Sequence, residues 1–143
     1  MQEVGSWVWG VEIGHPLKGE SNMLQSYRDL LVWQKALELA VRIYRVSERF
    51  PKSEIYGLTS QLRRAAVSVP SNIAEGYGRG SRKEYLQFLS VAQGSLKELE
   101  TQIILAQRLS YTSEIEAEGT LSESGTVGKM LGGLMRSLRT KVT

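Results

Sequence analysis

The chain has 143 residues, of which 41% are hydrophobic and 23% are charged, with a formal net charge of +3. This composition is typical of a globular protein, and the length fits one domain that can bury a usable core. Because the chain contains no cysteine, disulfides, thiolate metal sites and cysteine catalysis are excluded, and a reducing cytoplasm is the expected compartment. No apolar run approaches the roughly 18 to 20 residues that cross a bilayer, so no membrane association is expected.

The N-terminal segment differs in character from the rest. Residues 1–25 are rich in glycine and lack a helical period, and we expect them to form a disordered or loosely docked extension. An alternating, strand-like pattern occurs within it, at Trp7, Trp9, Val11 and Ile13. A lone short strand has nothing to pair with, so we do not expect a sheet there.

Three further features of this segment bear on function. His15 is the only histidine, and we expect it to be an incidental loop residue. Met23 stands just before the periodic part, which suggests that the protein starts there and that residues 1–22 are an upstream extension. Residues 1–25 hold one basic and three acidic residues, so the remaining chain holds 17 basic and 12 acidic residues. That surplus modestly favours an anionic partner.

A first helix is expected from about Asp29 to just before Pro51, which ends it. Its apolar stripe recurs at steps of three and four and consists of Leu30, Trp33, Leu37, Ala40, Val41 and Tyr44. Arg42, Arg45 and Arg49 form a basic ridge on the same helix. This ridge is either an ordinary solvated face or a surface that follows a phosphate backbone.

A second helix is expected to begin near Ser53 and Glu54, a capping acceptor followed by an acid at the positive helix end. Its stripe comprises Leu58, Leu62, Ala65, Val69 and Ile73. The stripe keeps its phase across Pro70, which favours one helix kinked at Pro70 over two separate helices. Asn72-x-x-Glu75 resembles a capping box, so the two-helix interpretation stays open.

The segment around Pro70 is rich in small and polar residues. We expect a polar network there that satisfies carbonyls freed by the proline and fixes the bend. Its predicted members are Ser68, Ser71, Asn72 and Glu75. Arg63 and Arg64 are the candidate functional contacts of this segment.

The second helix is followed by the glycine-rich stretch GYGRGSRKE. Ser81-x-x-Glu84 in it reads as a capping box for a third helix. The stretch lacks the Walker spacing, so it is either a plain interhelical turn or a contact with a nucleic-acid backbone through Arg79, Arg82 and Lys83. The third helix should end near Ser110, and its apolar stripe is Tyr85, Leu89, Ala92, Leu96, Leu99, Ile103 and Ala106.

The C-terminal part gives a weaker signal. Residues 112–128 mix acids, serine and glycine, and the start of the fourth helix is left open. That helix has the stripe Val127, Leu131, Leu134 and Leu138. Arg136, Arg139 and Lys141 near its end are expected to do no more than favour the negative helix terminus. The fold class is therefore an all-α, antiparallel up-down-up-down four-helix bundle over residues 26–143.

The bundle displays no catalytic constellation. A di-metal carboxylate site needs Glu-x-x-His pairs on facing helices, and a Ser–His–Asp triad also needs a histidine, but His15 lies outside the bundle. Asp29 is the only aspartate and is expected to cap a helix. We therefore predict a non-enzymatic protein with no catalytic residue, no metal and no cofactor.

Three segments of the sequence are similar to one known family. YRDLLVWQKALELAVRIY, FPKSEIYGLTSQLRRAAVSVPSNIAEGYGRGSRKEYLQFL and GSLKELETQIILA resemble the small four-helix bundle proteins encoded in intervening sequences of bacterial 23S rRNA genes, formerly labelled S23 ribosomal proteins. The likeness runs from about Ser26 to Leu138, and GLTSQLRRAAVSVPSNIAEG is its most specific part. The sequence departs from the family in residues 1–22 and in the Gly/Ser-rich segment 119–128.

The resemblance implies a homopentamer. It also implies kinship with the accessory variability determinant of diversity-generating retroelements, a pentameric bundle that binds nucleic acid and a reverse transcriptase. It supplies no catalytic residues.

Two functions follow as hypotheses. The first is a non-enzymatic, oligomeric accessory protein that binds RNA or DNA electrostatically. Its candidate contacts are Arg42, Arg45, Arg49, Arg63, Arg64, Arg79, Arg82 and Lys83. The alternative is a protein-interaction scaffold, for example for a partner resembling a reverse transcriptase, with no direct nucleic-acid role.

Overall fold

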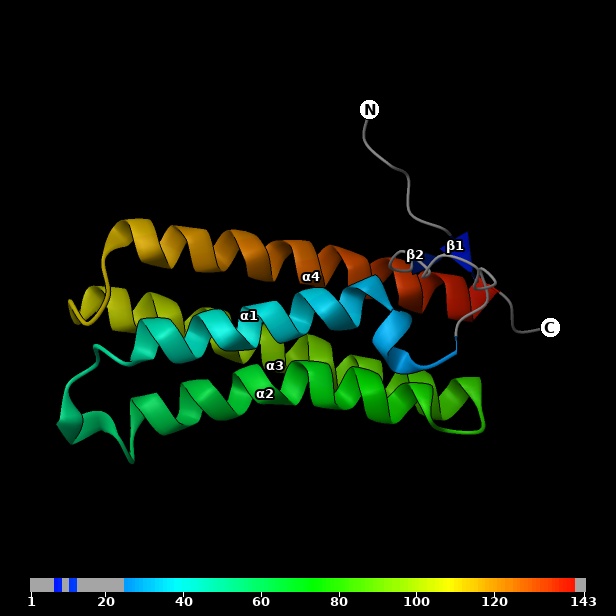
Figure 1. The fold of residues 1–143 in the computed structure, drawn as a ribbon, viewed down its shortest axis with the longest axis horizontal. Coiled ribbons are helices and arrows are strands. Elements are labelled where there is room, and N and C mark those ends of the chain that lie inside the picture. Colours follow the sequence, from blue (N-terminus) through cyan, green and yellow to red (C-terminus); the bar gives the residue numbers. More distant parts are fainter. Residues whose placement is uncertain (1–6, 9–10, 13–24, 141–143) are drawn as a thin grey trace.

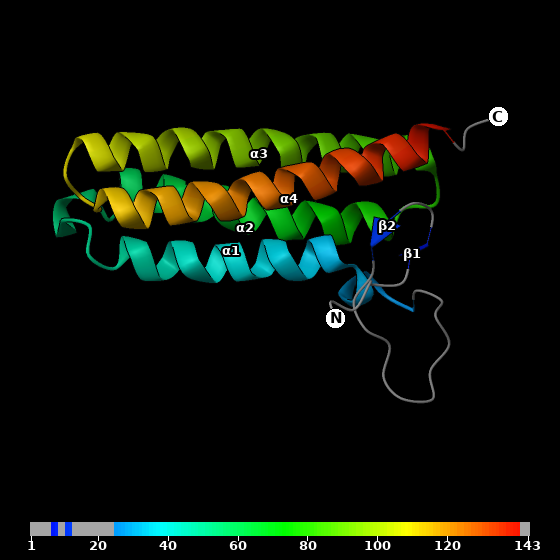
Figure 2. The ribbon, with the colours of Figure 1, turned by 90° about the horizontal axis from the view of Figure 1, so that it is seen from above.

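The computed structural model describes residues 7–8, 11–12 and 25–140. Four long helices run antiparallel along one axis (Figure 1). They are α1 (Leu31–Ser47), α2 (Leu58–Tyr77), α3 (Arg82–Arg108) and α4 (Glu114–Thr140). Each helix packs on the next in chain order, and α4 packs on α1 to close the bundle (Figure 2). The predicted all-α four-helix bundle is confirmed.

Short elements complete the fold. The 3₁₀ helix η1 (Tyr27–Asp29) precedes α1, and η2 (Lys52–Glu54) lies between α1 and α2. Near the N-terminus, β1 (Trp7–Val8) pairs antiparallel with β2 (Val11–Glu12), and β2 lies against α4. The expectation of no sheet in this segment is wrong, because β2 is a partner strand for β1. His15 and Met23 lie outside the described residues, as do the predictions made for them. No described helix has a stretch apolar enough and long enough for a bilayer.

Three of the four predicted apolar stripes form the core. The stripes of α2 and α4 are buried along their length, and so is that of α3 apart from its half-buried first member, Tyr85. The stripe predicted for α1 is partly wrong, because Leu37, Val41 and Tyr44 are 42%, 45% and 43% exposed. The side chains that α1 buries instead are Val32, Ala36, Leu39, Ala40, Ile43, Val46 and Ser47. This helix therefore has apolar side chains on two faces, and only one of them packs into the bundle.

Pro70 lies inside a single helix. The α2 helix continues through it to Tyr77, so the two-helix interpretation is wrong. The angle of the expected kink stays a prediction. Pro70 is buried, and its ring removes the hydrogen bond that would otherwise reach the carbonyl of Ala66.

The polar network near Pro70 has different members from those predicted. Asn72 Nδ2 donates to the carbonyl oxygen of Ser68 at 2.7 Å and to Ser68 Oγ at 2.9 Å. Ser68 Oγ lies 2.8 Å from Ser95 Oγ of α3. Ser71 and Glu75 are exposed, and no hydrogen bond joins them to these groups among the described residues. The network therefore links α2 to α3, and the carbonyl that it uses lies two residues after the one that the proline frees.

The second helix begins at Leu58, later than predicted, because η2 and a turn precede it. Glu54 still caps this helix from outside, since its Oε1 accepts the backbone N–H of Leu58 at 3.1 Å. Its other oxygen, Oε2, accepts a hydrogen bond from the Tyr111 hydroxyl at 2.9 Å. Glu54 thus joins the α1–α2 connection to the α3–α4 turn at the same end of the bundle.

Replacing Glu54 tests this junction. Glu54→Ala should lower the free energy of unfolding by about 1 kcal/mol through the lost cap alone. The hydrogen bond to Glu54 also raises the pKa of the Tyr111 phenol. A raised pKa in the folded state means that this stabilisation is present at neutral pH and is lost as the pH rises above the usual phenol value of about 10. Denaturant unfolding at neutral pH and at a pH above about 10 measures both effects. The control is Glu48→Ala, which removes an exposed carboxylate. Equal stability of the two variants contradicts the proposed role of Glu54.

The fourth helix begins at Glu114, so the expectation that residues 112–128 are a weak segment is wrong. The Ser113 hydroxyl accepts the N–H of Glu116 at 3.1 Å and caps the helix. Its first half buries small side chains, namely Ala117, Thr120 and Ser124. Packing of this narrow face against α1 and α3 outweighs the low helix propensity of the glycines.

Candidate nucleic-acid interface

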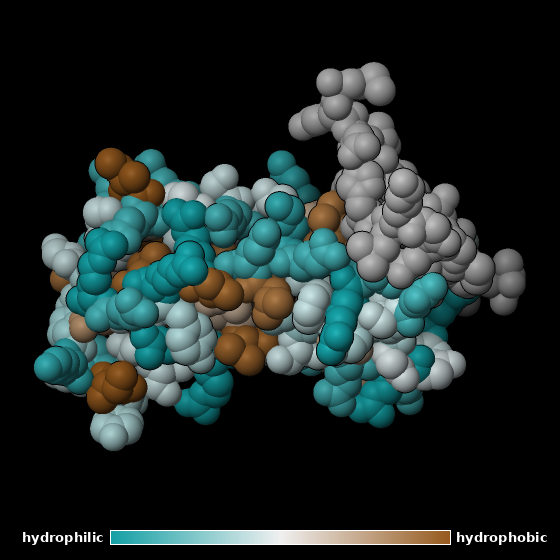
Figure 3. Space-filling model, viewed as in Figure 1, coloured by the Kyte–Doolittle hydropathy of each residue, from teal (hydrophilic) through white to brown (hydrophobic). Residues whose placement is uncertain are grey.

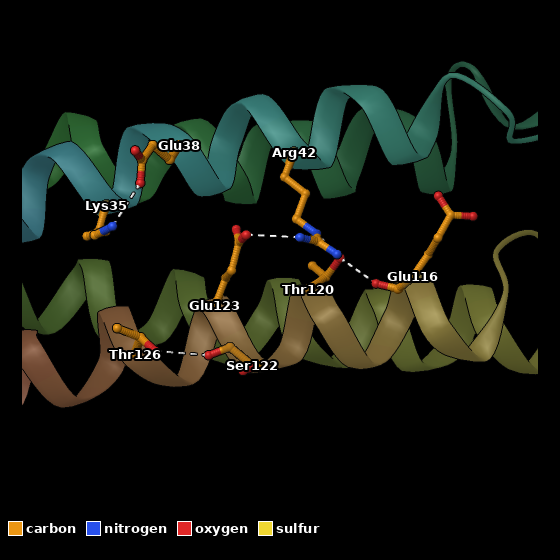
Figure 4. A network of polar contacts seen from close by, with 8 residues as sticks. All are labelled: Lys35, Glu38, Arg42, Glu116, Thr120, Ser122, Glu123 and Thr126. Carbon is orange, nitrogen blue, oxygen red and sulfur yellow. Dashed lines mark hydrogen bonds and ion pairs between the residues drawn. The ribbon is translucent and has the colours of Figure 1, made fainter.

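The basic ridge of α1 faces α4 and is largely neutralised there. Arg42 donates from Nε to Thr120 Oγ1 at 3.1 Å and from Nη1 to Glu123 Oε1 at 2.9 Å (Figure 4). Arg49 pairs with Glu116 at 3.2 Å, one turn before Thr120 on the same helix. The ridge therefore connects two helices through matched charges, and it does not present an unopposed row of cations to a phosphate backbone.

The third member of the ridge and the two arginines of α2 have different surroundings. Arg45 is exposed between the two paired arginines. Arg63 donates from Nε to Ser47 Oγ at 2.8 Å, and its guanidinium lies 4.7 Å from the ring centre of Tyr44. It is thus held at the last turn of α1, where the helix dipole favours a cation. Arg64 is exposed and borders a shallow groove of about 420 Å³ between the two helices.

A second group of cations lies at one end of the bundle, where η1, the α2–α3 turn and the last turns of α4 meet (Figures 1 and 2). We call this end the basic end. Among residues 25–140 it carries six cations, Arg28, Arg79, Arg82, Lys83, Arg136 and Arg139, against three carboxylates, Asp29, Glu75 and Glu84. Among the same residues, the opposite end carries four cations, Arg45, Arg49, Lys52 and Arg108, against five carboxylates, Glu48, Glu54, Glu114, Glu116 and Glu118. The described bundle is therefore electrically polar along its long axis.

Two of the three carboxylates at the basic end are engaged in local structure. Asp29 Oδ2 accepts the backbone N–H groups of Gln25 and Ser26 at 2.9 and 3.2 Å. Glu75 pairs with Arg79 at 3.0 Å. The side chains of Lys83, Arg136 and Arg139 are exposed, with no ion pair found for them among the described residues. This end therefore offers cations that a polyanion can contact.

Aromatic side chains near the basic end are packed into the protein. The rings of Tyr77 and Tyr85 meet edge to face with 6.2 Å between their centres, and both are half-buried. Burial, and in second place the neighbouring Tyr77, raise the pKa of Tyr85. The Phe88 ring is covered by the Arg79 guanidinium at 4.8 Å. Because Tyr77, Tyr85 and Phe88 are engaged within the fold, none of these three rings is a platform on which unpaired bases would stack.

The turn that presents Arg79, Arg82 and Lys83 depends on a close approach of two helices. Gly76 is buried, and a Cβ at this position would lie 2.8 Å from Phe88 Cβ and 3.3 Å from the carbonyl oxygen of Tyr85. Ser81 then caps α3 by accepting the N–H of Glu84 at 3.2 Å. This bond is one of the two that the predicted capping box would contain.

Sequence reasoning missed the contribution of α4 to this end. Arg136 and Arg139 were assigned only a local interaction with the helix terminus. The signal that places them was available, because an up-down-up-down topology brings the end of the fourth helix beside the turn between the second and third. In contrast, the pairing of Arg42 and Arg49 depends on Thr120, Glu123 and Glu116, which lie in the segment where the start of the fourth helix was left open.

Comparison with known proteins settles the family. The family model described as "23S rRNA-intervening sequence protein" matches residues 28–133. The chain belongs to the 23S rRNA-intervening sequence protein family. A crystal structure from Bacteroides thetaiotaomicron VPI-5482, described as a protein of unknown function from the S23 ribosomal protein family, has a TM-score of 0.67 and 26% sequence identity. The match covers 74% of this chain and 99% of that chain. No match was found among curated proteins.

Membership of the 23S rRNA-intervening sequence protein family confirms the resemblance seen in the sequence. The family match ends at residue 133, so Arg136 and Arg139 lie beyond it. Among the described residues, no group of three His, Asp or Glu side chains is placed to hold a metal ion.

Proposed function

We propose that this 23S rRNA-intervening sequence protein is a non-enzymatic, oligomeric accessory protein that binds RNA or DNA electrostatically through its basic end. The observation that carries the proposal is the convergence, within residues 25–140, of six cations from three separate parts of the chain against three carboxylates. The acidic character of the opposite end supports it further, because a polar charge distribution orients the protein as it approaches a polyanion.

The chemistry of this end defines the kind of ligand. Arginine and lysine bind phosphate oxygens, and these contacts position a protein on nucleic acid without reading its sequence. The tyrosines that would stack on bases are packed against each other. Binding should therefore depend on backbone charge and be weakly selective between sequences, and a double helix is a sufficient ligand.

A direct titration tests the proposal. Full-length protein is added to labelled RNA and DNA duplexes of one sequence, and of a second unrelated sequence, at about 50 mM salt, where phosphate contacts are strongest. We expect complexes with every duplex and similar affinities for the two sequences. The absence of any complex at this salt concentration contradicts a nucleic-acid function.

A protein-interaction scaffold is the second candidate, and one observation favours it. Eleven large hydrophobic side chains of the described residues are more than 40% exposed, several of them together on α1 and α2. Large exposed apolar patches are typical of surfaces that contact other proteins. A polymerase-like partner that stays bound after nuclease treatment, and that also binds a variant with a neutralised basic end, would support the scaffold.

Both candidate functions include self-association of the protein. We propose an assembly of identical copies, five by resemblance to the family. Several copies would present several basic ends to one nucleic acid, and such multivalency raises the overall affinity without any new contact.

A further inference from the structure

One surface of the bundle carries apolar side chains that neither the core nor the basic end uses. Leu37, Val41 and Tyr44 of α1 are between 42% and 45% exposed, and Val67 of α2 is 43% exposed. In Figure 3, hydrophobic side chains gather over the middle of α1 and α2. We call this surface the α1–α2 face. Scattered apolar residues need no explanation, but a contiguous group of this kind marks an interaction surface.

The two helices contribute side chains of different size to this face. The α1 residues Leu37, Val41 and Tyr44 are large and follow steps of four and three. The outer residues of α2 follow the same steps and are mostly small: Ser60, Arg64, Val67, Ser71, Ala74 and Gly78. Large side chains on one helix and small ones on the other, both with the seven-residue spacing of coiled coils, suit packing of knobs into holes.

The two stripes lie side by side at the same level. Arg63 of α2 binds Ser47 and the Tyr44 carbonyl, which sets the two antiparallel helices in register. Counting one turn from this contact, back along α1 from Tyr44 and forward along α2 from Arg63, places Val41 level with Val67. The large and the small stripe therefore form one continuous face that is complementary to itself.

We propose that α1 of one copy packs on α2 of a second copy through the α1–α2 face. This inference rests on the oligomeric part of the proposed function and names its contact surface. The charges on the face agree with it. Arg64 and Glu48 are both exposed near the same end of the face, and no ion pair is found for either within the described residues. A second copy supplies an opposite charge to each of them.

The first test measures the mass of the full chain in solution. Wild-type protein should be oligomeric, and Val41→Glu should be monomeric with unchanged helix content, because an unpaired carboxylate would be buried at the contact. Val91→Glu is the matched control, since Val91 is 52% exposed on α3, a helix that contributes no residue to the α1–α2 face, and its variant should keep the wild-type mass. An oligomer that survives Val41→Glu overturns the assigned surface but leaves the oligomeric proposal standing. A monomeric wild type overturns both.

The second test uses the absence of cysteine from the chain. Val41→Cys and Val67→Cys proteins are mixed under mild oxidation, and a disulfide-linked dimer of the two variants is expected. Disulfides form only where the Cα atoms lie within roughly 7 Å, so the linkage reports α1 directly against α2. A mixture of Val91→Cys with Val67→Cys should stay unlinked. Linkage of the control pair with equal yield, or no linkage between positions 41 and 67, overturns the proposed contact.

Discussion

Reversing the charge of Arg136 and Arg139 together is expected to weaken duplex binding on the order of 50-fold at 0.1 M salt. Each phosphate contact contributes close to one unit to the slope of log affinity against log salt. At 0.1 M salt, two such contacts raise the affinity by nearly two powers of ten above its value at about 1 M, and the double variant loses this gain. The slope of that dependence should fall by about two units as well. Fluorescence anisotropy of a labelled duplex, with the Arg136→Glu and Arg139→Glu double variant, measures both changes.

A control variant at the opposite end of the bundle separates position from net charge. Lys52→Glu with Arg108→Glu makes the same change in total charge at exposed residues. The two double variants are also matched in that each removes an arginine from the last turn of a long helix. The control should lose far less affinity than the basic-end variant. Equal losses from the two variants would mean that overall charge governs binding, and would contradict a basic end.

Adding one methyl group at Gly76 is expected to lower the free energy of unfolding by about 1–3 kcal/mol. The new Cβ in Gly76→Ala would lie 2.8 Å from Phe88 Cβ and 3.3 Å from the Tyr85 carbonyl oxygen, so α2 and α3 would have to separate. For a chain of this size, each kcal/mol lowers the melting temperature by roughly 2–4 °C. Thermal unfolding followed by circular dichroism measures the shift.

Gly94 on α3 provides the matched control. It is exposed, and a Cβ there meets nothing within 4 Å. Gly94→Ala should therefore stabilise the protein by about 0.5–1 kcal/mol, because alanine favours the helix interior. If Gly76→Ala is also stabilising, the two helices have room at the turn, and the close approach has no role in holding Arg79, Arg82 and Lys83.

Much of the fold follows from the sequence because the longest apolar stripe of three helices is the one that is buried. Every member of the stripe from Leu89 to Ala106 is buried, although Val91, Ile104 and Leu105 on the same helix are exposed. The first helix is different, since Leu37, Val41 and Tyr44 follow the same spacing as the buried Val32, Ala36 and Leu39. Periodicity shows that both faces are apolar, and only the packing of the other helices decides which one is inside.

The fourth helix shows the limit of helix propensity. Its serines and glycines predict a weak segment when they are read alone. In the bundle, the small side chains of Thr120 and Ser124 fit close to neighbouring helices, and Ser124 donates to Glu100 Oε2 at 2.6 Å. Such contacts exist only once the tertiary structure has formed, so local sequence does not contain them.

The candidate interface was partly predictable. Arg79, Arg82 and Lys83 stand together in the sequence, whereas Arg136 and Arg139 join them only through the topology. The ridge of Arg42 and Arg49 was a reasonable hypothesis from spacing, but spacing on one helix does not reveal the carboxylates of another. Glu123 and Glu116 face this ridge from α4 and neutralise two of its three charges.

The salt dependence of duplex binding by the wild-type protein tests the central claim most directly. If the basic end binds phosphates, log affinity should fall linearly with log salt from about 50 to 200 mM, with a slope of about −3 or steeper per bound copy. Lys83, Arg136 and Arg139 set this scale, because they are exposed and no ion pair is found for them among the described residues. A slope near zero, or binding that appears with one duplex sequence alone, would contradict an electrostatic nucleic-acid-binding function.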